Sequence, residues 1–330
     1  MLEYAFFHNF SRRALTNNTF EHELSVLESI LRAGLLLVPE ALVLAGEPLV
    51  EGRKGNPIQF IQRRFSMTLL TPSELPAHGA RFGRFAIEYD LASGRQLGAI
   101  PVIYLPQPSA TGEYQTLDAI SATLLYRLRE VFFLLTDLST LERSIEVTDE
   151  TDQIRLSPGT GGDARTVDVA SLRKVLEMLG SDKQSFVDLV AACQVIFHLF
   201  YPTDKRRSDL DSMLLNVFYY QQREWRIFSD ILVGQRQERM LNSEEIKKLC
   251  AHDNFFSELI EATDPQTNAL VIRRRAELCR VLERVDGRHP STFIKRIWLP
   301  SEAKSPVTKL LQRIGCSIEL TAYKPDPLSN

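Results

Sequence analysis

The sequence predicts an α+β protein whose mixed β-sheet comes from both ends of the chain, with a helical insertion between them. Strand and helix patterns alternate over roughly the first hundred residues, the middle of the chain carries long helical patterns, and strand-like sequence returns after residue 216. Residues 1–115 and 216–330 are therefore expected to form the α/β core, and residues 116–215 the helical insertion.

The first third of the chain supplies the first strands of this core. Residues 4–10 have the composition of a strand, and residues 20–31 place Leu24, Leu27 and Ile30 at helical spacing, with Gly34 as a plausible helix end. A glycine-rich, charged loop is expected at 46–55. Further strands are predicted at 65–70, 85–89 and 101–105, with a short helical turn at 73–80.

The middle and the end of the chain differ in character. Residues 117–141, 169–179 and 184–200 are predicted as helices, and the polar stretch 149–168, which contains a proline and three glycines, as an exposed loop. Strand-like sequence follows at 225–228 and 293–300. A helix at 306–314 and a strand at 317–323 complete the expected fold.

Composition limits the function classes. With 330 residues, 44% hydrophobic and 25% charged, the chain can bury the core of one large or two ordinary domains. The net charge of −3 gives no global attraction to nucleic acid or to an anionic membrane, although local basic patches leave nucleic acid open as a partner. No apolar run approaches the roughly 20 residues of a spanning helix, and the four cysteines lie far apart. We expect a cytoplasmic protein with reduced thiols and no membrane contact.

The segment 219–226, Tyr-Tyr-Gln-Gln-Arg-Glu-Trp-Arg, is the most informative stretch for function. Glu224 follows Gln222 by two residues and precedes Arg226 by two. On an extended segment these three side chains would share one face. A carboxylate, an amide and a guanidinium would then converge on one ligand, so this segment is the candidate site.

Several segments resemble the AbiGi family of bacterial abortive phage-resistance proteins. The resemblance rests on His8 with Ser11, on residues 27–35, 65–68 and 81–89, and on the later triplet 224–226 with the strand–helix–strand that ends the chain. It implies a component of bacterial antiphage defence that acts as an antitoxin or a regulatory protein. A protein partner from the same defence system is therefore expected.

In element order the chain also resembles the ADP-ribosyltransferase superfamily, which surrounds NAD with a polar residue on the first strand, a Ser/Thr strand and a glutamate. This weaker resemblance makes NAD the candidate cofactor and implies an ADP-ribosyltransferase or NAD glycohydrolase as the alternative function. Glu224 would stabilise an oxocarbenium-like transition state, and Gln222 would orient the acceptor group. The implied cofactor-binding residues are His8, Ser66, Thr68 and Arg226, with Arg12 or Arg13 as alternatives to Arg226 for the pyrophosphate.

Each candidate also has a structural interpretation. Glu224 and Arg226 can form a buried ion pair while Trp225 fills the core, because buried charges require partners. His8 stands among phenylalanines, as a core histidine with its hydrogen bonds made would. Ser66 and Thr68 are common types of strand residue. The remaining histidines lack the close helical spacing of a metalloprotease site, so no metal is expected. A non-catalytic interaction protein and an NAD-dependent enzyme both remain open.

Overall fold

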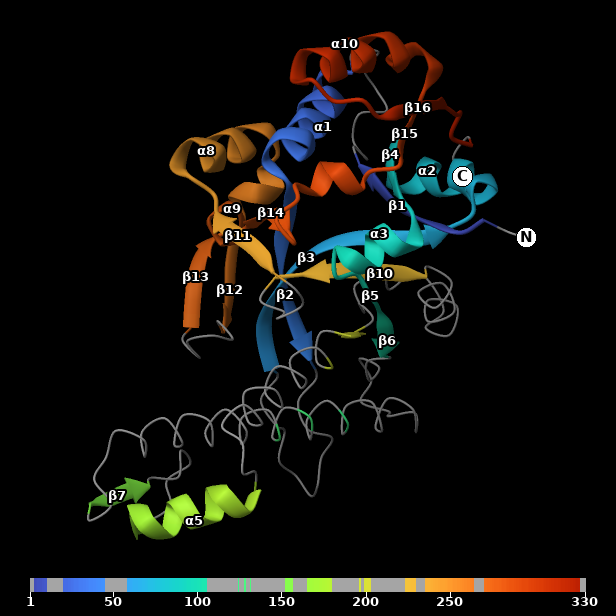
Figure 1. The fold of residues 1–330 in the computed structure, drawn as a ribbon. Helices are drawn as coiled ribbons and strands as arrows, with labels where there is room; N and C mark the ends of the chain where they lie inside the picture. The colour runs from blue at the N-terminus through green and yellow to red at the C-terminus, as the bar shows by residue number, and fades with distance from the viewer. Residues whose placement is uncertain are drawn as a thin grey trace, which may run out of the picture.

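The computed structural model describes residues 3–10, 20–44, 58–105, 152–156, 165–179, 199–202, 223–229, 235–263 and 270–326, together with four single positions between 124 and 196. These residues form an α+β fold with a mixed, largely antiparallel sheet of 12 strands (Figure 1), which confirms that the chain is an α+β protein with a mixed sheet. Within these ranges, no helix is long and apolar enough to cross a membrane.

Strand β3 (Ile58–Leu70) lies at the centre of the sheet. It pairs antiparallel with β1 (Ala5–Phe10), β2 (Leu35–Leu44) and β10 (Glu224–Phe228), and β10 also pairs with β5 (Ile100–Pro101). Strand β4 (Phe85–Tyr89) continues the sheet beyond β1. Segments more than 150 residues apart in sequence, β3 and β10, are therefore neighbours.

The last part of the chain adds strands at both edges of the sheet. Strands β11 (Arg236–Met240) and β14 (Arg280–Val285) extend it beyond β2, and β12 (Leu259–Thr263) with β13 (Leu270–Arg274) forms a hairpin beside β3. Strand β15 (Arg296–Leu299) pairs with β4. It is joined through helix α10 (Lys304–Ile314) to the parallel strand β16 (Glu319–Ala322), as a parallel pair requires a crossover.

One face of the sheet, here called the apolar face, carries the main core. Phe6, Phe65, Met67 and Ile227 are buried on it, under helices α1 (Glu21–Ala33), α8 (Ser243–His252) and α10 (Figure 1). Helix α1 ends at Gly34, whose φ of 116° is unfavourable for other residues, and a Cβ there would lie 2.1 Å from a backbone oxygen of β14. The predicted helix end is therefore confirmed.

The opposite face, here called the polar face, carries a row of polar side chains. Strand alternation places Gln62, Arg64, Ser66 and Thr68 of β3 on this face, together with Glu224 and Arg226 of β10. Strand β6 (Ile103–Leu105) pairs with β9 (Phe200–Pro202) on this side of the sheet (Figure 1). The two faces thus differ in chemistry as well as in what covers them.

Ten further elements complete the described part of the fold. They are η2 (Pro72–Glu74), α2 (Leu75–Phe82), α3 (Leu91–Gln96), β7 (Gln153–Leu156), β8 (Arg165–Asp168), α5 (Val169–Leu179), η3 (Asn254–Ser257), α9 (Arg275–Leu278), η4 (Pro290–Phe293) and η5 (Ser301–Ala303).

The expected exposed loop at 149–168 is wrong in part. Residues 153–156 and 165–168 pair as the antiparallel strands β7 and β8, because the ends of this polar stretch still alternate isoleucine, leucine and valine with polar residues. The helices at 117–141 and 184–200 lie almost entirely outside the described residues, as does the loop at 46–55, so the domain limits at 116 and 215 stay a prediction.

Candidate functional site

Glu224 and Arg226 form an ion pair on the polar face of β10. Because they are two residues apart on an extended strand, their side chains lie side by side. Arg226 Nε lies 2.7 Å from Glu224 Oε1 and donates to it, and Nη2 donates to Oε2 at 3.0 Å. This bidentate geometry is the strong form of a guanidinium–carboxylate contact. The side chain of Arg226 is only 2% exposed and that of Glu224 13%.

Two neighbours complete the network around this pair. The Tyr104 hydroxyl, from β6, donates to Glu224 Oε2 in a short hydrogen bond, and Gln62 Oε1 accepts from Arg226 Nη1 at 3.4 Å. Tyr104 is itself buried. Both oxygens of Glu224 are therefore occupied by protein donors, and the pair connects the central sheet to β6.

The surroundings keep Glu224 ionised. Burial alone would raise the pKa of its carboxyl, but the positive charges of Arg226 and Arg64 and the hydrogen bonds from Arg226 and Tyr104 lower it to about 2. Burial and the nearby carboxylate raise the pKa of Tyr104 well above its usual range. Glu224 cannot act as a general acid near neutral pH, because it carries no proton to donate.

Ser66 and Thr68 lie beside the ion pair. Arg226 is opposite Ser66, and Glu224 is opposite Thr68, in the antiparallel pairing of β10 with β3. Directly opposed residues in such a pair share one face. The structure therefore brings together four of the six residues expected from the sequence, all on the polar face.

His8 lies on the other face of the sheet. Phe7 is opposite Thr68 in the pairing of β1 with β3, so His8, the next residue, points to the apolar face. Its ring packs on Phe65 with 3.9 Å between ring centroids, and its Nδ1 lies 2.7 Å from the carbonyl oxygen of Ser66. The structure thus brings His8 to the backbone of Ser66 but not to the Glu224 carboxylate.

Burial lowers the pKa of His8 from 6.5 to about 4, although its hydrogen bond with Ser66 acts in the opposite direction. The ring is therefore neutral at physiological pH. Since a carbonyl oxygen can only accept, Nδ1 carries the hydrogen and Nε2 is left as an acceptor.

Gln222 lies outside the described residues, and so do Arg12 and Arg13. The described structure begins again at Arg223, whose φ of 45° interrupts the extended conformation immediately before β10. Strand alternation, which placed Gln222 on the face of Glu224, therefore does not extend through residue 223. The assignment of Gln222 stays a prediction.

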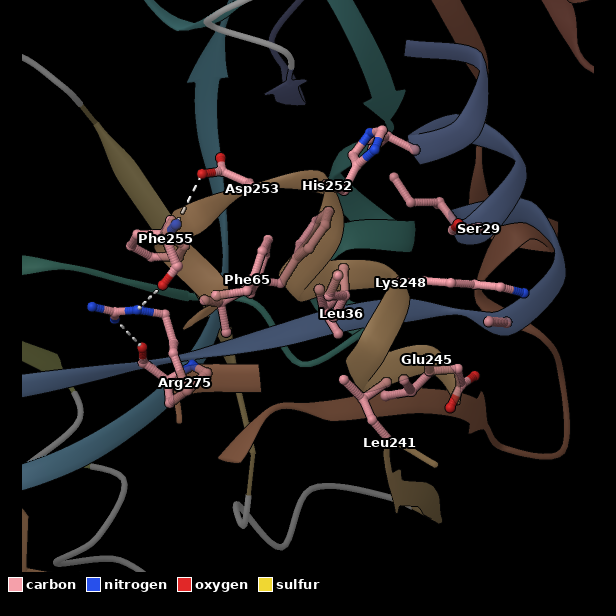
Figure 2. Close-up of a pocket in the computed structure, with 18 of the residues that line it drawn as sticks. Ser29, Leu36, Phe65, Leu241, Glu245, Lys248, His252, Asp253, Phe255 and Arg275 are labelled. Atoms are coloured by element: carbon pink, nitrogen blue, oxygen red, sulfur yellow. Dashed lines mark hydrogen bonds between the residues drawn. The ribbon is translucent and has the colours of Figure 1, made fainter. Parts of the chain in front are cut away.

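A large cavity of the described structure lies on the apolar face, away from the ion pair. It has a volume of about 1680 Å³ and is bounded by α1, α8, η3 and the strands β2 and β3. Figure 2 shows Leu36 and Phe65 at its floor, with Ser29, Lys248 and His252 around them. His8 lines this cavity, whereas Glu224 does not.

Sequence reasoning did not identify helix α8, which forms one wall of this cavity. A recognisable signal precedes the helix: the Asn242 side chain accepts hydrogen bonds from the backbone of Glu244 and Glu245, and the Glu245 side chain accepts from the Asn242 backbone. This reciprocal capping is readable as Asn followed three residues later by Glu. At the cavity edge, His22 of α1 forms a short hydrogen bond with His252 of α8.

Neither a metal cluster nor a known relative identifies the site. Among the residues that the structure describes, no group of three or more His, Cys, Asp or Glu side chains is placed to hold a metal ion. No protein-family pattern matches the chain, and comparison with curated proteins and with solved structures gives no match.

Proposed function

We propose that this chain is a non-catalytic, partner-binding regulator, antitoxin-like in role, within a bacterial antiphage defence system. The defence context rests on the resemblance of its first third to the AbiGi family. The non-catalytic character is supported by one observation above all: both carboxylate oxygens of Glu224 are occupied, by Arg226 and by Tyr104. A carboxylate that stabilises charge on a substrate must present an oxygen to that substrate.

The ion pair has a sufficient structural role. It joins β10 to β6 through Tyr104, and β10 is itself held between β3 and β5. Trp225, between the two charged residues, points to the opposite face and packs on Phe6 with 5.1 Å between ring centroids. The triplet 224–226 therefore contributes to packing on both faces of the sheet.

One observation favours the alternative proposal, an ADP-ribosyltransferase or NAD glycohydrolase. Ser66 and Thr68 share the face of Glu224, as a nicotinamide–ribose site would require. For this chemistry a substrate would have to displace Tyr104 or Arg226 from the carboxylate. Displacing Arg226 would leave its guanidinium, which is only 2% exposed, buried without a counter-charge, and this is costly.

Two measurements distinguish these proposals. For a non-catalytic regulator, the purified chain should release no nicotinamide from NAD, and millimolar NAD should leave its melting temperature unchanged, since any ligand that binds the native state raises apparent stability. Nicotinamide release that is lost in a folded Glu224→Gln variant would establish the enzyme instead.

The partner-binding role has its own test. Cells that produce the companion toxin of the same defence locus should recover growth when this chain is produced with it, and the two purified proteins should form a complex of defined stoichiometry. A chain that neither restores growth nor forms the complex would contradict the proposed role, whatever the outcome with NAD.

A further inference from the structure

The cavity on the apolar face has the form of a small-molecule site. Its volume of about 1680 Å³ is sufficient for any ligand that fills an ordinary pocket of roughly 300–1,000 Å³. Helices α1 and α8 form two of its walls, and strands β2 and β3 form its floor (Figure 2). Apolar side chains such as Leu36, Phe65, Leu249 and Phe256 line much of it, as is usual for sites that bind organic ligands.

His8 provides a fixed polar group in this cavity. Its ring is held by the packing on Phe65 and by the hydrogen bond that Nδ1 donates to the Ser66 carbonyl. Within the described parts of the chain, no group donates a hydrogen bond to His8 Nε2. Since the pKa of His8 is lowered to about 4 by burial, Nε2 keeps its lone pair throughout the physiological pH range.

Three of the cations that line the cavity form ion pairs with carboxylates. Lys248 forms an ion pair with Glu244, and Arg32 with Glu28. Arg275 pairs with Glu258, and it also donates to the backbone carbonyl oxygen of Phe255, as Figure 2 shows. An anionic ligand would have to compete with these carboxylates for a cation, and any charge buried against the apolar floor of Leu36 and Phe65 would be costly, so the lining favours an uncharged molecule.

We propose that this cavity binds an uncharged, largely apolar small molecule that donates an N–H or O–H hydrogen bond to His8 Nε2. This inference does not depend on the proposed defence role. It requires a donor because a ligand that offered only an acceptor at this position would leave two lone pairs facing each other away from water. Such an unsatisfied contact weakens binding by about tenfold or more.

The test uses two probes that differ only in the donor, indole and 1-methylindole. With the full-length wild-type chain, isothermal titration should give at least about tenfold tighter binding for indole than for 1-methylindole. The variant His8→Phe keeps a ring on Phe65 but removes the acceptor, so the two probes should bind it with equal affinity. The matched control His78→Phe replaces a histidine of α2 that does not line the cavity, and it should keep the wild-type discrimination.

Three outcomes would overturn the proposal: no binding of indole to the wild type, equal binding of both probes, or discrimination that survives in His8→Phe. If His8→Phe does not fold, the wild type alone still decides. The ¹⁵N resonance of His8 Nε2 should shift on saturation with indole and not with 1-methylindole, and an unchanged resonance with both probes would refute the hydrogen bond.

Discussion

The substitution Glu224→Gln tests the structural account of the triplet 224–226 most directly. Glutamine keeps the length and shape of glutamate and keeps an oxygen that accepts from the Tyr104 hydroxyl. It removes the negative charge that the guanidinium of Arg226 contacts at 2.7 and 3.0 Å. The variant therefore leaves a positive charge buried without its counter-charge.

The expected magnitude follows from the burial of the two partners. Removing one partner of a buried ion pair costs about 3–5 kcal/mol of unfolding free energy, because the remaining charge is desolvated and uncompensated. Arg226 is 2% exposed and Glu224 is 13% exposed, so water reaches the pair only from the glutamate side. With glutamine still able to accept hydrogen bonds, we expect a loss near the lower limit, about 3 kcal/mol.

Urea denaturation, followed by circular dichroism, measures this loss. The matched control is Glu244→Gln, which makes the same chemical change in the ion pair with Lys248, where both side chains are 75% exposed. An exposed pair at this helical spacing contributes about 0.5 kcal/mol or less. If Glu224→Gln destabilises the chain no more than the control does, the ion pair does not support the fold and the argument for a structural role fails.

Three further predictions concern other parts of the fold. Between pH 6.5 and about 4 the unfolded chain binds a proton at His8 more readily than the folded chain does, so the free energy of unfolding should fall on acidification. The variant His8→Phe should show a smaller fall. Equal slopes of unfolding free energy against pH in the two proteins would contradict the lowered pKa of His8. Gly34→Ala should cost more stability than Gly287→Ala, since both have positive φ but only Gly34 has a backbone oxygen 2.1 Å from the added Cβ; equal losses would exclude the clash. Trp298→Phe removes the 2.6 Å hydrogen bond to the buried Glu88 and should lower stability by about 1–3 kcal/mol; an unchanged urea midpoint would show that other partners suffice.

Local patterns predicted those elements whose signals are confined to a few residues. The predicted ranges 85–89 and 169–179 coincide with β4 and α5. Strand β2 was not predicted; Pro39 stands in its middle, and prolines usually interrupt strands. In the structure, Pro39 lies beyond residues 35–37, which pair with β14, and its carbonyl oxygen accepts from Arg275. Proline has no backbone N–H to donate, and at this position β14 no longer pairs with β2, so no strand needs that donor.

The candidate site was predictable only where it depends on spacing within one strand. The shared face of Glu224 and Arg226 follows from their separation by two residues. The position of His8 depends instead on the register of β1 against β3, in which a change of one residue moves a side chain to the opposite face. Register is set by contacts between segments about 60 residues apart, and no local pattern encodes it.

A strand that carries Glu and Arg two residues apart holds opposite charges on one face at contact distance, so the simplest partner for each charge is the other. A catalytic carboxylate needs the opposite condition, in which its cation is engaged elsewhere and an oxygen is open to the substrate. On β10 the two charges pair with each other, and the Tyr104 hydroxyl donates a further hydrogen bond to the carboxylate. On the apolar face the reverse is true of His8, which lines the cavity and whose Nδ1 is the only ring nitrogen with a hydrogen bond among the described residues. Binding chemistry in this chain is therefore expected first at the neutral imidazole, and only after rearrangement at the charged pair.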